Sequence, residues 1–203
     1  MKIICIGRNY ADHAKELNNP IPKEPLFFLK PDSAILPNNN PFFIPEFTNE
    51  VHYEIEIVLK ISRLGKHIES QFGHKYFEEI GLGIDFTARD IQQQCKEKGH
   101  PWEKAKAFDG SAPLGRFMDK KEFTNLSNIA FSLTQNGVVK QMGNTKDMIF
   151  SFDEIIAYVS QFMTLKIGDL IFTGTPAGVG SISEDDLLEG FIGDKKMISC
   201  RVK

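Results

Sequence analysis

Residues 52–61 read HYEIEIVLKI, an alternating and β-branched stretch that predicts a β-strand. Successive side chains of a strand point to opposite faces, so Glu54 and Glu56 share one face, about 7 Å apart at Cα. Ile55 and Ile57 then face the core. Two like charges side by side on a strand repel each other unless positive charge lies between them. The stretch therefore predicts a core strand that carries a candidate cation site.

A second apolar strand, expected over residues 80–86, carries Asp85 near its end. Three carboxylates, with no His or Cys nearby in the sequence, suit a hard cation such as Mg²⁺, Mn²⁺ or Ca²⁺. The alternative is a solvated strand face with ordinary surface glutamates. Whether Asp85 lies near the two glutamates depends on the fold, so the cation-site and surface interpretations both stay open at this point.

The remaining elements are short and do not alternate regularly between strand and helix. Asn136-Gly137 lies between two apolar runs, which is typical of a β-hairpin. Thr87 with Asp90, and Ser151 with Glu154, have the spacing of helix capping boxes. This pattern favours an α+β fold with a mostly β core. The other expected strands are 2–6, 26–29, 129–134, 138–142, 169–173 and 197–202, and the other expected helices are 10–17 and 72–79.

A His-Glu pair lies near the N-terminus. His13 and Glu16 are three residues apart and share a face on a helical turn. A carboxylate beside an imidazole orients the ring, and such a pair can act as a general base on water. Gly7 and the proline-rich stretch that follows could hinge this segment as a lid. The alternative is a surface histidine beside a surface glutamate.

Polar residues follow Asp85 along the chain. Arg89 and Gln92 are three residues apart at the start of the expected helix and lie close to any cation that Asp85 binds. Residues 103–106 are expected to be extended, which places Lys104 and Lys106 on one face. A lysine beside a bound oxo acid can hold a carboxylate or offset enolate charge. The alternative is a solvated basic face.

The glycine-rich run TGTPAGVG, residues 173–180, follows the expected strand 169–173. Its glycines allow tight turns and close approach of backbone N–H groups to an anion. The run lacks the Gly-Lys-Ser/Thr ending of a nucleotide P-loop, so ATP and GTP binding are not expected. It is either an anion-binding loop or a structural turn.

Composition limits the class of protein. The 203 residues are 41% hydrophobic and 25% charged, which is the balance of a globular protein and is expected to form one domain. A net charge of -3 leaves no broad basic field for nucleic acid or an anionic membrane. The three cysteines form no CxxC pair, which argues against zinc and disulfides. We find no signal peptide and no membrane-length apolar run, so we expect a cytoplasmic protein.

Taken together, the motifs resemble the fumarylacetoacetate hydrolase family, in particular its acylpyruvase and oxaloacetate decarboxylase branch. The matching stretches are 7–10 with His13 and Glu16, then 28–31, 54–56, 85–90, 102–106, 108–110 and 173–180. The resemblance implies a mixed β-roll or β-sandwich with short helices over residues 1–203, a mobile lid at about 8–25, and a homodimer. It implies metal ligands Glu54, Glu56 and Asp85, catalytic residues His13, Glu16, Lys106 and Gln92, and substrate-binding residues Arg8, Arg89 and Thr175.

The resemblance also implies a reaction. The family uses Mg²⁺ or Mn²⁺, with Ca²⁺ an occupant in crystals, and acts on small 2-oxo acids. We expect an acylpyruvate hydrolase that cleaves a C–C bond through a metal-held pyruvate enolate. The alternatives are an oxaloacetate decarboxylase or tautomerase, a 2-hydroxyhepta-2,4-diene-1,7-dioate isomerase, and a non-catalytic protein that binds an oxo acid.

Overall fold

The HYEIEIVLKI stretch forms two strands, β4 (Val51–Tyr53) and β5 (Ile55–Ile61), and not the single strand that we expected. The computed structural model describes residues 1–16 and 20–203, and our expectations for residues 17–19 fall outside it. At Glu54 the chain passes from one sheet to another, because β4 pairs with β7 and β12 whereas β5 pairs with β6 and β11. The break lies at Glu54 itself, one of the two predicted site glutamates.

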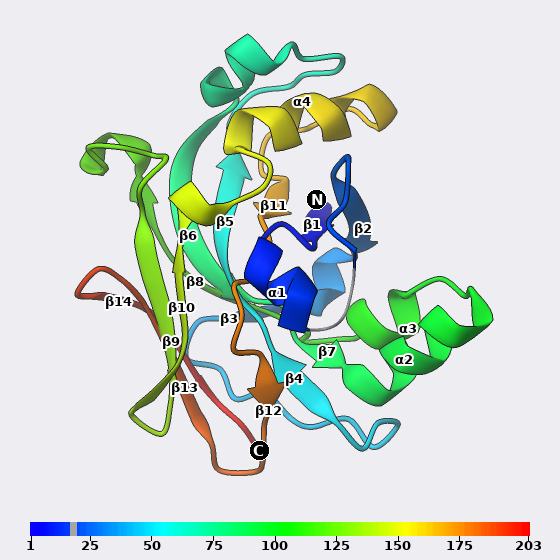
Figure 1. The fold of residues 1–203 in the computed structure, drawn as a ribbon. Coiled ribbons are helices and arrows are strands. Elements are labelled where there is room, and N and C mark those ends of the chain that lie inside the picture. Colours follow the sequence, from blue (N-terminus) through cyan, green and yellow to red (C-terminus); the bar gives the residue numbers. More distant parts are fainter. Residues whose placement is uncertain (17–19) are drawn as a thin grey trace.

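The described residues form three sheets that curl around a common core (Figure 1). A seven-stranded sheet runs in the order β2-β1-β11-β5-β6-β8-β3, a four-stranded sheet in the order β10-β9-β13-β14, and a three-stranded sheet in the order β12-β4-β7. The remaining strands of the first sheet are β1 (Ile3–Gly7), β2 (Leu26–Lys30), β3 (Ile35–Pro37), β6 (Phe77–Ile84), β8 (Ala112–Asp119) and β11 (Leu170–Phe172). Those of the second are β9 (Ala130–Gln135), β10 (Val138–Asn144), β13 (Leu187–Ile192) and β14 (Lys195–Arg201), and β7 (Thr87–Ala88) and β12 (Gly180–Ser181) complete the third.

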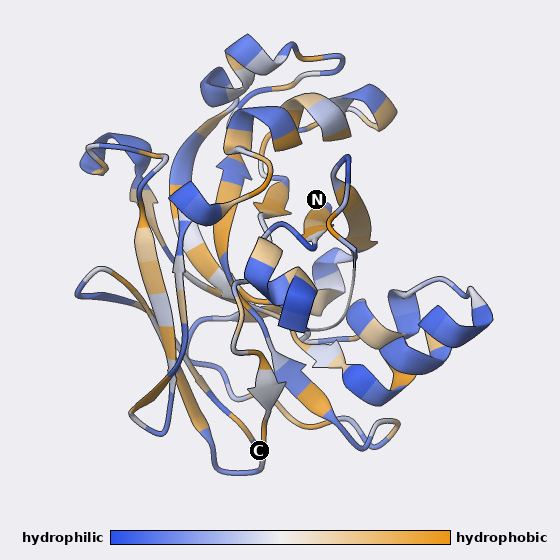
Figure 2. Ribbon diagram, viewed as in Figure 1, coloured by the Kyte–Doolittle hydropathy of each residue, from blue (hydrophilic) through white to orange (hydrophobic). Residues whose placement is uncertain are grey.

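The core lies between the two larger sheets. Ile55, Ile57 and Leu82 are fully buried, and a Cβ on Gly190 of β13 would meet Ile55 Cδ1 at 3.0 Å and Leu82 Cδ1 at 3.3 Å. The apolar strands form the interior in Figure 2. The expected α+β class with a mostly β, curled architecture is therefore confirmed.

Helices cover the outside of the sheets. They are α1 (Ala11–Glu16), α2 (Arg89–Lys98), α3 (Glu103–Lys106) and α4 (Phe152–Phe162), and the 3-10 turns are η1 (Asp32–Ala34), η2 (Ser70–Lys75), η3 (Lys120–Glu122) and η4 (Thr145–Asp147). The helix expected at 72–79 is wrong: η2 ends at Lys75 and β6 begins at Phe77. Pairing of β6 with β5 and β8 overrides the local helical pattern. No described helix has the length and apolar character needed to cross a bilayer.

Local turn and capping signals succeeded elsewhere. Asn136 and Gly137 have φ of 54° and 79° and join β9 to β10, as the hairpin prediction requires. Ser151 and Glu154 form the complete capping box at the start of α4. Both signals depend on neighbours only a few residues away.

Candidate functional site

Three carboxylates converge at the centre of the molecule. Glu54, Glu56 and Asp85 are at most 5% exposed, and one carboxylate oxygen from each lies within 4.8 Å of the others. The pairing of β5 with β6 brings them together, because Glu56 lies opposite Gly83 and the Asp85 N–H donates to the Glu54 carbonyl at 2.8 Å. The sheet therefore joins the third acid to the pair.

The oxygens of the triad are only partly satisfied by the protein. Asp85 Oδ1 lies 2.7 Å from Lys30 Nζ, yet it is buried without a hydrogen bond to any described residue, so that contact is electrostatic in character. Glu56 accepts one hydrogen bond, from the backbone N–H of Gly174 at 2.7 Å. Buried carboxylate oxygens with spare lone pairs are the donors that a hard divalent cation prefers. The residues fit such an ion.

The two glutamates differ in their electrostatics. Burial acts to raise the pKa of Glu54, but Lys106 and Arg89 outweigh it and hold that pKa well below its usual range. The pKa of Glu56 is raised well above its usual range, first by burial and then by Asp85 and Glu54. A cation beside Glu56 would favour its ionised form.

Lys106 lies between two of the acids. Its ammonium donates to Glu54 at 2.9 Å, to Asp85 at 2.7 Å and to Thr87 at 2.6 Å. Burial acts to lower the pKa of Lys106, but Asp85 and Glu54 outweigh it and raise that pKa, which keeps the side chain charged. Residues 103–106 form helix α3 and not an extended segment, so Lys104 lies exposed while Lys106 is buried.

The expected capping box at the start of α2 is also wrong. Ala88 is the N-cap residue and makes no side-chain cap. Thr87 instead accepts from Lys106, and Asp90 accepts from the Thr48 hydroxyl at 2.5 Å. The two side chains that the local pattern assigned to the helix cap therefore make other contacts, Thr87 within the site and Asp90 with a neighbouring loop.

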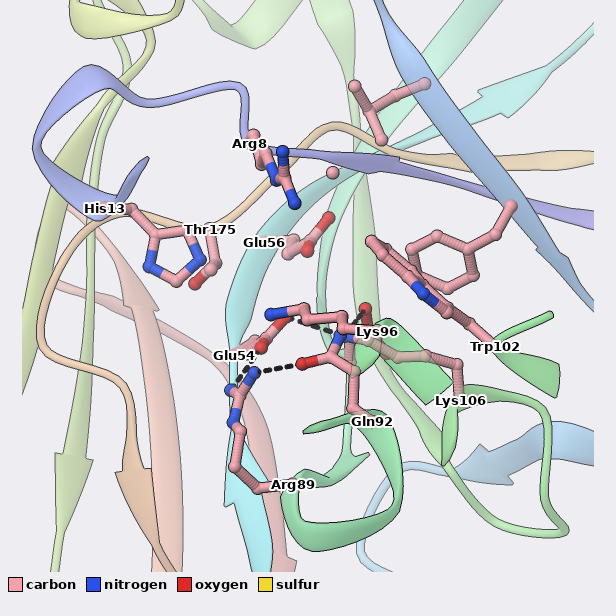
Figure 3. A pocket seen from close by; sticks show the side chains of 14 residues that line it. Arg8, His13, Glu54, Glu56, Arg89, Gln92, Lys96, Trp102, Lys106 and Thr175 are labelled. Carbon is pink, nitrogen blue, oxygen red and sulfur yellow. Dashed lines mark hydrogen bonds and ion pairs between the residues drawn. The ribbon is translucent and has the colours of Figure 1, made fainter. Parts of the chain in front are cut away.

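The His-Glu pair lies at the same pocket. His13 Nδ1 is 3.3 Å from a Glu16 carboxylate oxygen, and Glu16 accepts from the Gly178 N–H at 3.0 Å. His13 is buried and lines the pocket with the triad (Figure 3). Burial is the largest cause that lowers the pKa of His13 below its usual value of 6.5. A neutral imidazole therefore faces the carboxylates at neutral pH.

The expected substrate-binding residues also line the pocket. Arg89 donates to Glu54 at 2.6 Å and to the Gln92 side-chain carbonyl at 2.7 Å, as the dashed lines in Figure 3 show. Arg8 lies opposite Arg89 in the same view and has a φ of 59°. The Thr175 hydroxyl also faces this space. The structure thus brings together every residue that we predicted for the site, except Glu16, which supports His13 from behind.

Sequence reasoning missed Gln141. Its side-chain oxygen accepts from the Ile55 N–H at 2.9 Å, and its amide donates to Thr175 Oγ1 at 2.8 Å and to the Pro176 carbonyl at 2.9 Å. It therefore joins the strand that carries the glutamates to the glycine-rich loop. A polar residue inside the hairpin strand 138–144 was the only signal, and it did not point to a site.

Two lysines were missed as well. Lys30 is fully buried beside Asp85 and also donates to the Ser111 carbonyl at 2.9 Å. It belongs to a stretch that carried the family resemblance, but no partner for its charge could be identified from the sequence. Lys96, from the last turn of α2, lines the pocket with Trp102. It was not predicted as a site residue because it lies in a helix with many exposed polar residues.

Comparison with known proteins assigns the family. The family model described as fumarylacetoacetate (FAA) hydrolase C-terminal matches residues 2–203. Over 201 residues the chain is 41% identical to oxaloacetate tautomerase FAHD1, mitochondrial, of Rattus norvegicus, covering 99% of this chain and 90% of that protein. Over 189 residues it is 41% identical to oxaloacetate decarboxylase, mitochondrial, of Dictyostelium discoideum, covering 93% of this chain and 87% of that protein.

A solved structure agrees with this assignment. The fumarylpyruvate hydrolase of Pseudomonas aeruginosa, solved in complex with Mn²⁺ and pyruvate, is 36% identical and superimposes with a TM-score of 0.94, covering 100% of this chain and 89% of that one. The match covers the strands and loops that build the pocket. The chain therefore belongs to the fumarylacetoacetate hydrolase family.

Proposed function

We propose that this protein is a divalent-metal-dependent enzyme that interconverts the keto and enol forms of oxaloacetate. The observation that carries the proposal is a neutral, buried imidazole, His13, in one pocket with three buried carboxylates. The names of the rat relative and of the Dictyostelium relative, both oxaloacetate enzymes, support this substrate. The Pseudomonas structure supports a divalent metal.

Glu54, Glu56 and Asp85 would hold the cation, which we propose to be Mg²⁺ or Mn²⁺. When bound, such an ion supplies Lewis-acid stabilisation of negative charge on a 2-oxo oxygen. Lys106, which is charged and hydrogen-bonded to two of the three acids, offsets part of the negative charge of the triad. It also lies where it can stabilise charge that develops on the substrate.

His13 is the base in this scheme. Its Nδ1 faces Glu16, which favours the tautomer with the proton on Nδ1 and leaves Nε2 free to accept. In the enol-forming direction Nε2 removes a proton from C3 of the oxo acid while the 2-oxo oxygen gains a proton from water; in the reverse direction the imidazolium returns its proton to C3 and the enol O–H proton goes to water. Glu16 is held by the Gly178 N–H, so the carboxylate that orients the ring is itself fixed in place.

The polar side chains of the pocket have donors left for the substrate. Gln92 uses its side-chain oxygen to accept from Arg89, so its amide can donate to a substrate oxygen. Thr175 accepts from Gln141 through Oγ1, so its hydroxyl proton is free to bind a carboxylate. Arg8 and Arg89 supply positive charge on two sides. We propose these four side chains as the substrate-binding set.

Hydrolysis of a 2,4-dioxo acid is a second candidate. His13 is placed to activate water as readily as to abstract a proton, and the Pseudomonas hydrolase holds pyruvate in a fold that superimposes closely. Oxaloacetate decarboxylation and isomerisation of a hydroxyheptadienedioate need the same electron withdrawal at the 2-oxo group. The fold alone does not choose among these reactions.

A turnover panel tests the proposal. Oxaloacetate tautomerisation, oxaloacetate decarboxylation, acetylpyruvate cleavage and dienedioate isomerisation are measured with Mg²⁺, with Mn²⁺ and with chelator. We expect metal-dependent tautomerisation to have the highest kcat/KM and to fall about 10²–10⁴-fold in His13→Ala but not in His100→Ala, an exposed histidine. Faster acetylpyruvate cleavage would select the hydrolase, and tight binding without any turnover would select a binding protein.

Three further expectations extend this proposal. We propose a cytoplasmic homodimer in which residues 8–25 close over the substrate. Light scattering of the purified protein measures the oligomeric state, and a mass of about 23 kDa, the monomer value, would contradict the dimer. Proteolysis within 8–25 that slows when metal and oxalate are added would support the lid.

A further inference from the structure

Two cationic side chains in the pocket have no anionic partner among the residues that the structure describes. Arg8 and Lys96 both line it, and neither side chain forms a hydrogen bond or an ion pair with residues 1–16 or 20–203. Arg89 and Lys106, the other two cations of the lining, are paired with Glu54 or Asp85. The unpaired positive charge is therefore concentrated on Arg8 and Lys96.

The net charge of the pocket lining also favours an anionic ligand. Four cationic side chains face three carboxylates, so the lining is positive even before a divalent cation adds two charges. A 2-oxo acid with one carboxylate would leave part of this charge uncompensated. A dicarboxylate such as oxaloacetate brings a second negative charge and compensates more of it.

Lys96 is held in this position at an electrostatic cost. Its pKa is lowered by burial first, and then by the positive charges of Arg89 and Arg8. Among the described residues, its ammonium lies near one aromatic ring, that of Trp102, at 6.0 Å from the ring centroid, which is the outer limit of a cation–π interaction. An anion bound beside Lys96 would offset both the repulsion by the two arginines and the cost of burying the charge. The ammonium of Lys96 in the pocket lining is therefore suited to a carboxylate partner.

We propose that Lys96 binds the substrate carboxylate remote from the 2-oxo group, and so selects dicarboxylic over monocarboxylic 2-oxo acids. The inference rests on the proposed function, in which the 2-oxo end of the substrate lies at the acidic triad. Arg8 and Thr175 then remain for the carboxylate next to the 2-oxo group. Lys96 is a specificity-determining residue in this scheme.

A pair of four-carbon substrates tests it. Metal-dependent exchange of the C3 hydrogens into D₂O is followed by NMR for oxaloacetate and for 2-oxobutyrate, which lacks the second carboxylate. In Lys96→Met we expect kcat/KM for oxaloacetate to fall about 10–100-fold, the loss expected for one charge-assisted hydrogen bond, and kcat/KM for 2-oxobutyrate to change less than about threefold. Lys96→Arg should restore most of the loss. Lys98→Met, an exposed lysine of the same helix, is the matched control.

Binding without turnover separates this inference from the proposed function. Calorimetry with Mn²⁺ present compares malate with 2-hydroxybutyrate, two hydroxy acids that differ in the second carboxylate. We expect Lys96→Met to weaken malate binding about 10–100-fold and to leave 2-hydroxybutyrate binding nearly unchanged, whether or not the wild type turns over oxaloacetate. Equal losses for both acids, or no loss for malate, would overturn the assignment of Lys96.

Discussion

At the scale of single residues, the site depends on groups whose charge is set by burial. Glu54 is paired with Lys106 and Arg89, whereas Glu56 has one backbone donor and two carboxylates nearby. The three acids are therefore not equivalent. We expect a bound cation to affect the ionisation of Glu56 most, because burial and two neighbouring carboxylates raise its pKa, so this proposed ligand is the most direct point at which to test the site.

Glu56→Gln should weaken Mn²⁺ binding by at least about 100-fold, because it removes one of three charged ligands. Gln can still accept from Gly174, and the change removes a buried carboxylate whose raised pKa marks it as unfavourable in the metal-free fold above pH 4.5. The metal-free variant should therefore melt no lower than the wild type. Calorimetric titration with Mn²⁺ and thermal melts measure both effects. Glu46→Gln, at an exposed position, is the control, and unchanged Mn²⁺ affinity in Glu56→Gln would contradict the metal site.

The pH dependence of activity should report His13. A general base acts in its neutral form, so kcat/KM falls as the pH drops through the pKa of His13. Burial lowers that pKa, and the acid limb of the profile should lie below pH 6.5. The measurement is kcat/KM for oxaloacetate from about pH 4.5 to about pH 8, compared with His13→Ala. An acid limb above pH 6.5 would show that the free enzyme holds this histidine in its charged form.

At the scale of elements, the site is assembled where strands end and loops begin. Glu54 lies at the passage from β4 to β5, Asp85 follows β6, and the 173–180 run follows β11. Gln141 of β10 hydrogen-bonds to Ile55 and to Thr175, and so connects β5 to the 173–180 run. A side chain outside the pocket therefore determines the position of side chains within it.

Gln141→Leu should destabilise the protein by about 2–4 kcal/mol, because it leaves the buried Ile55 N–H and the Pro176 carbonyl without partners. It should also raise the KM for oxaloacetate, since Thr175 loses its fixed orientation. Urea unfolding and steady-state kinetics measure the two effects. Gln161→Leu, at an exposed position of α4, should change neither. A stable Gln141→Leu protein with normal kinetics would show that the hydrogen bonds are dispensable.

At the scale of the whole molecule, the pocket draws on residues from both ends of the chain. Arg8 and His13 come from the first segment and Thr175 from the last third, and β1 lies parallel to β11 in the large sheet. A cation at the triad would join the β4–β5 passage to the end of β6, and β5 is the central strand of that sheet. Metal binding should consequently stabilise the fold as a whole.

Saturating Mn²⁺ or Mg²⁺ should raise the melting temperature of the wild type. A ligand present at about 100 times its Kd adds about 2.7 kcal/mol to the unfolding free energy, which for a chain of this size is a shift of several degrees. Differential scanning calorimetry with metal and with chelator measures the shift. Glu56→Gln should show much less of it, and Ca²⁺ provides a comparison of ionic size. Equal shifts in wild type and Glu56→Gln would place the stabilising ion elsewhere.

The sequence by itself determined the local features of this protein. Asn136-Gly137 specifies a tight turn, and Ser151 with Glu154 caps a helix, because both depend on backbone geometry within four residues. The order of the motifs was enough to predict the family, which the comparisons confirm, and a set of site residues that, apart from Glu16, line one pocket. Alternation in 52–61 also marked Glu54 and Glu56 as neighbours.

Only the tertiary structure decided the rest. The expected helix at 72–79 is a 3-10 turn up to Lys75 and a strand from Phe77, because β5 and β8 pair with β6, and 103–106 became a helix whose turn buries Lys106 against acids 21 and 52 residues away in sequence. Gln141 and Lys30 gained their contacts, and Lys96 its place in the pocket, in the same way. Their contacts join segments that are far apart along the chain, and no local pattern encodes a contact whose strength comes from burial and from charges brought together by the fold.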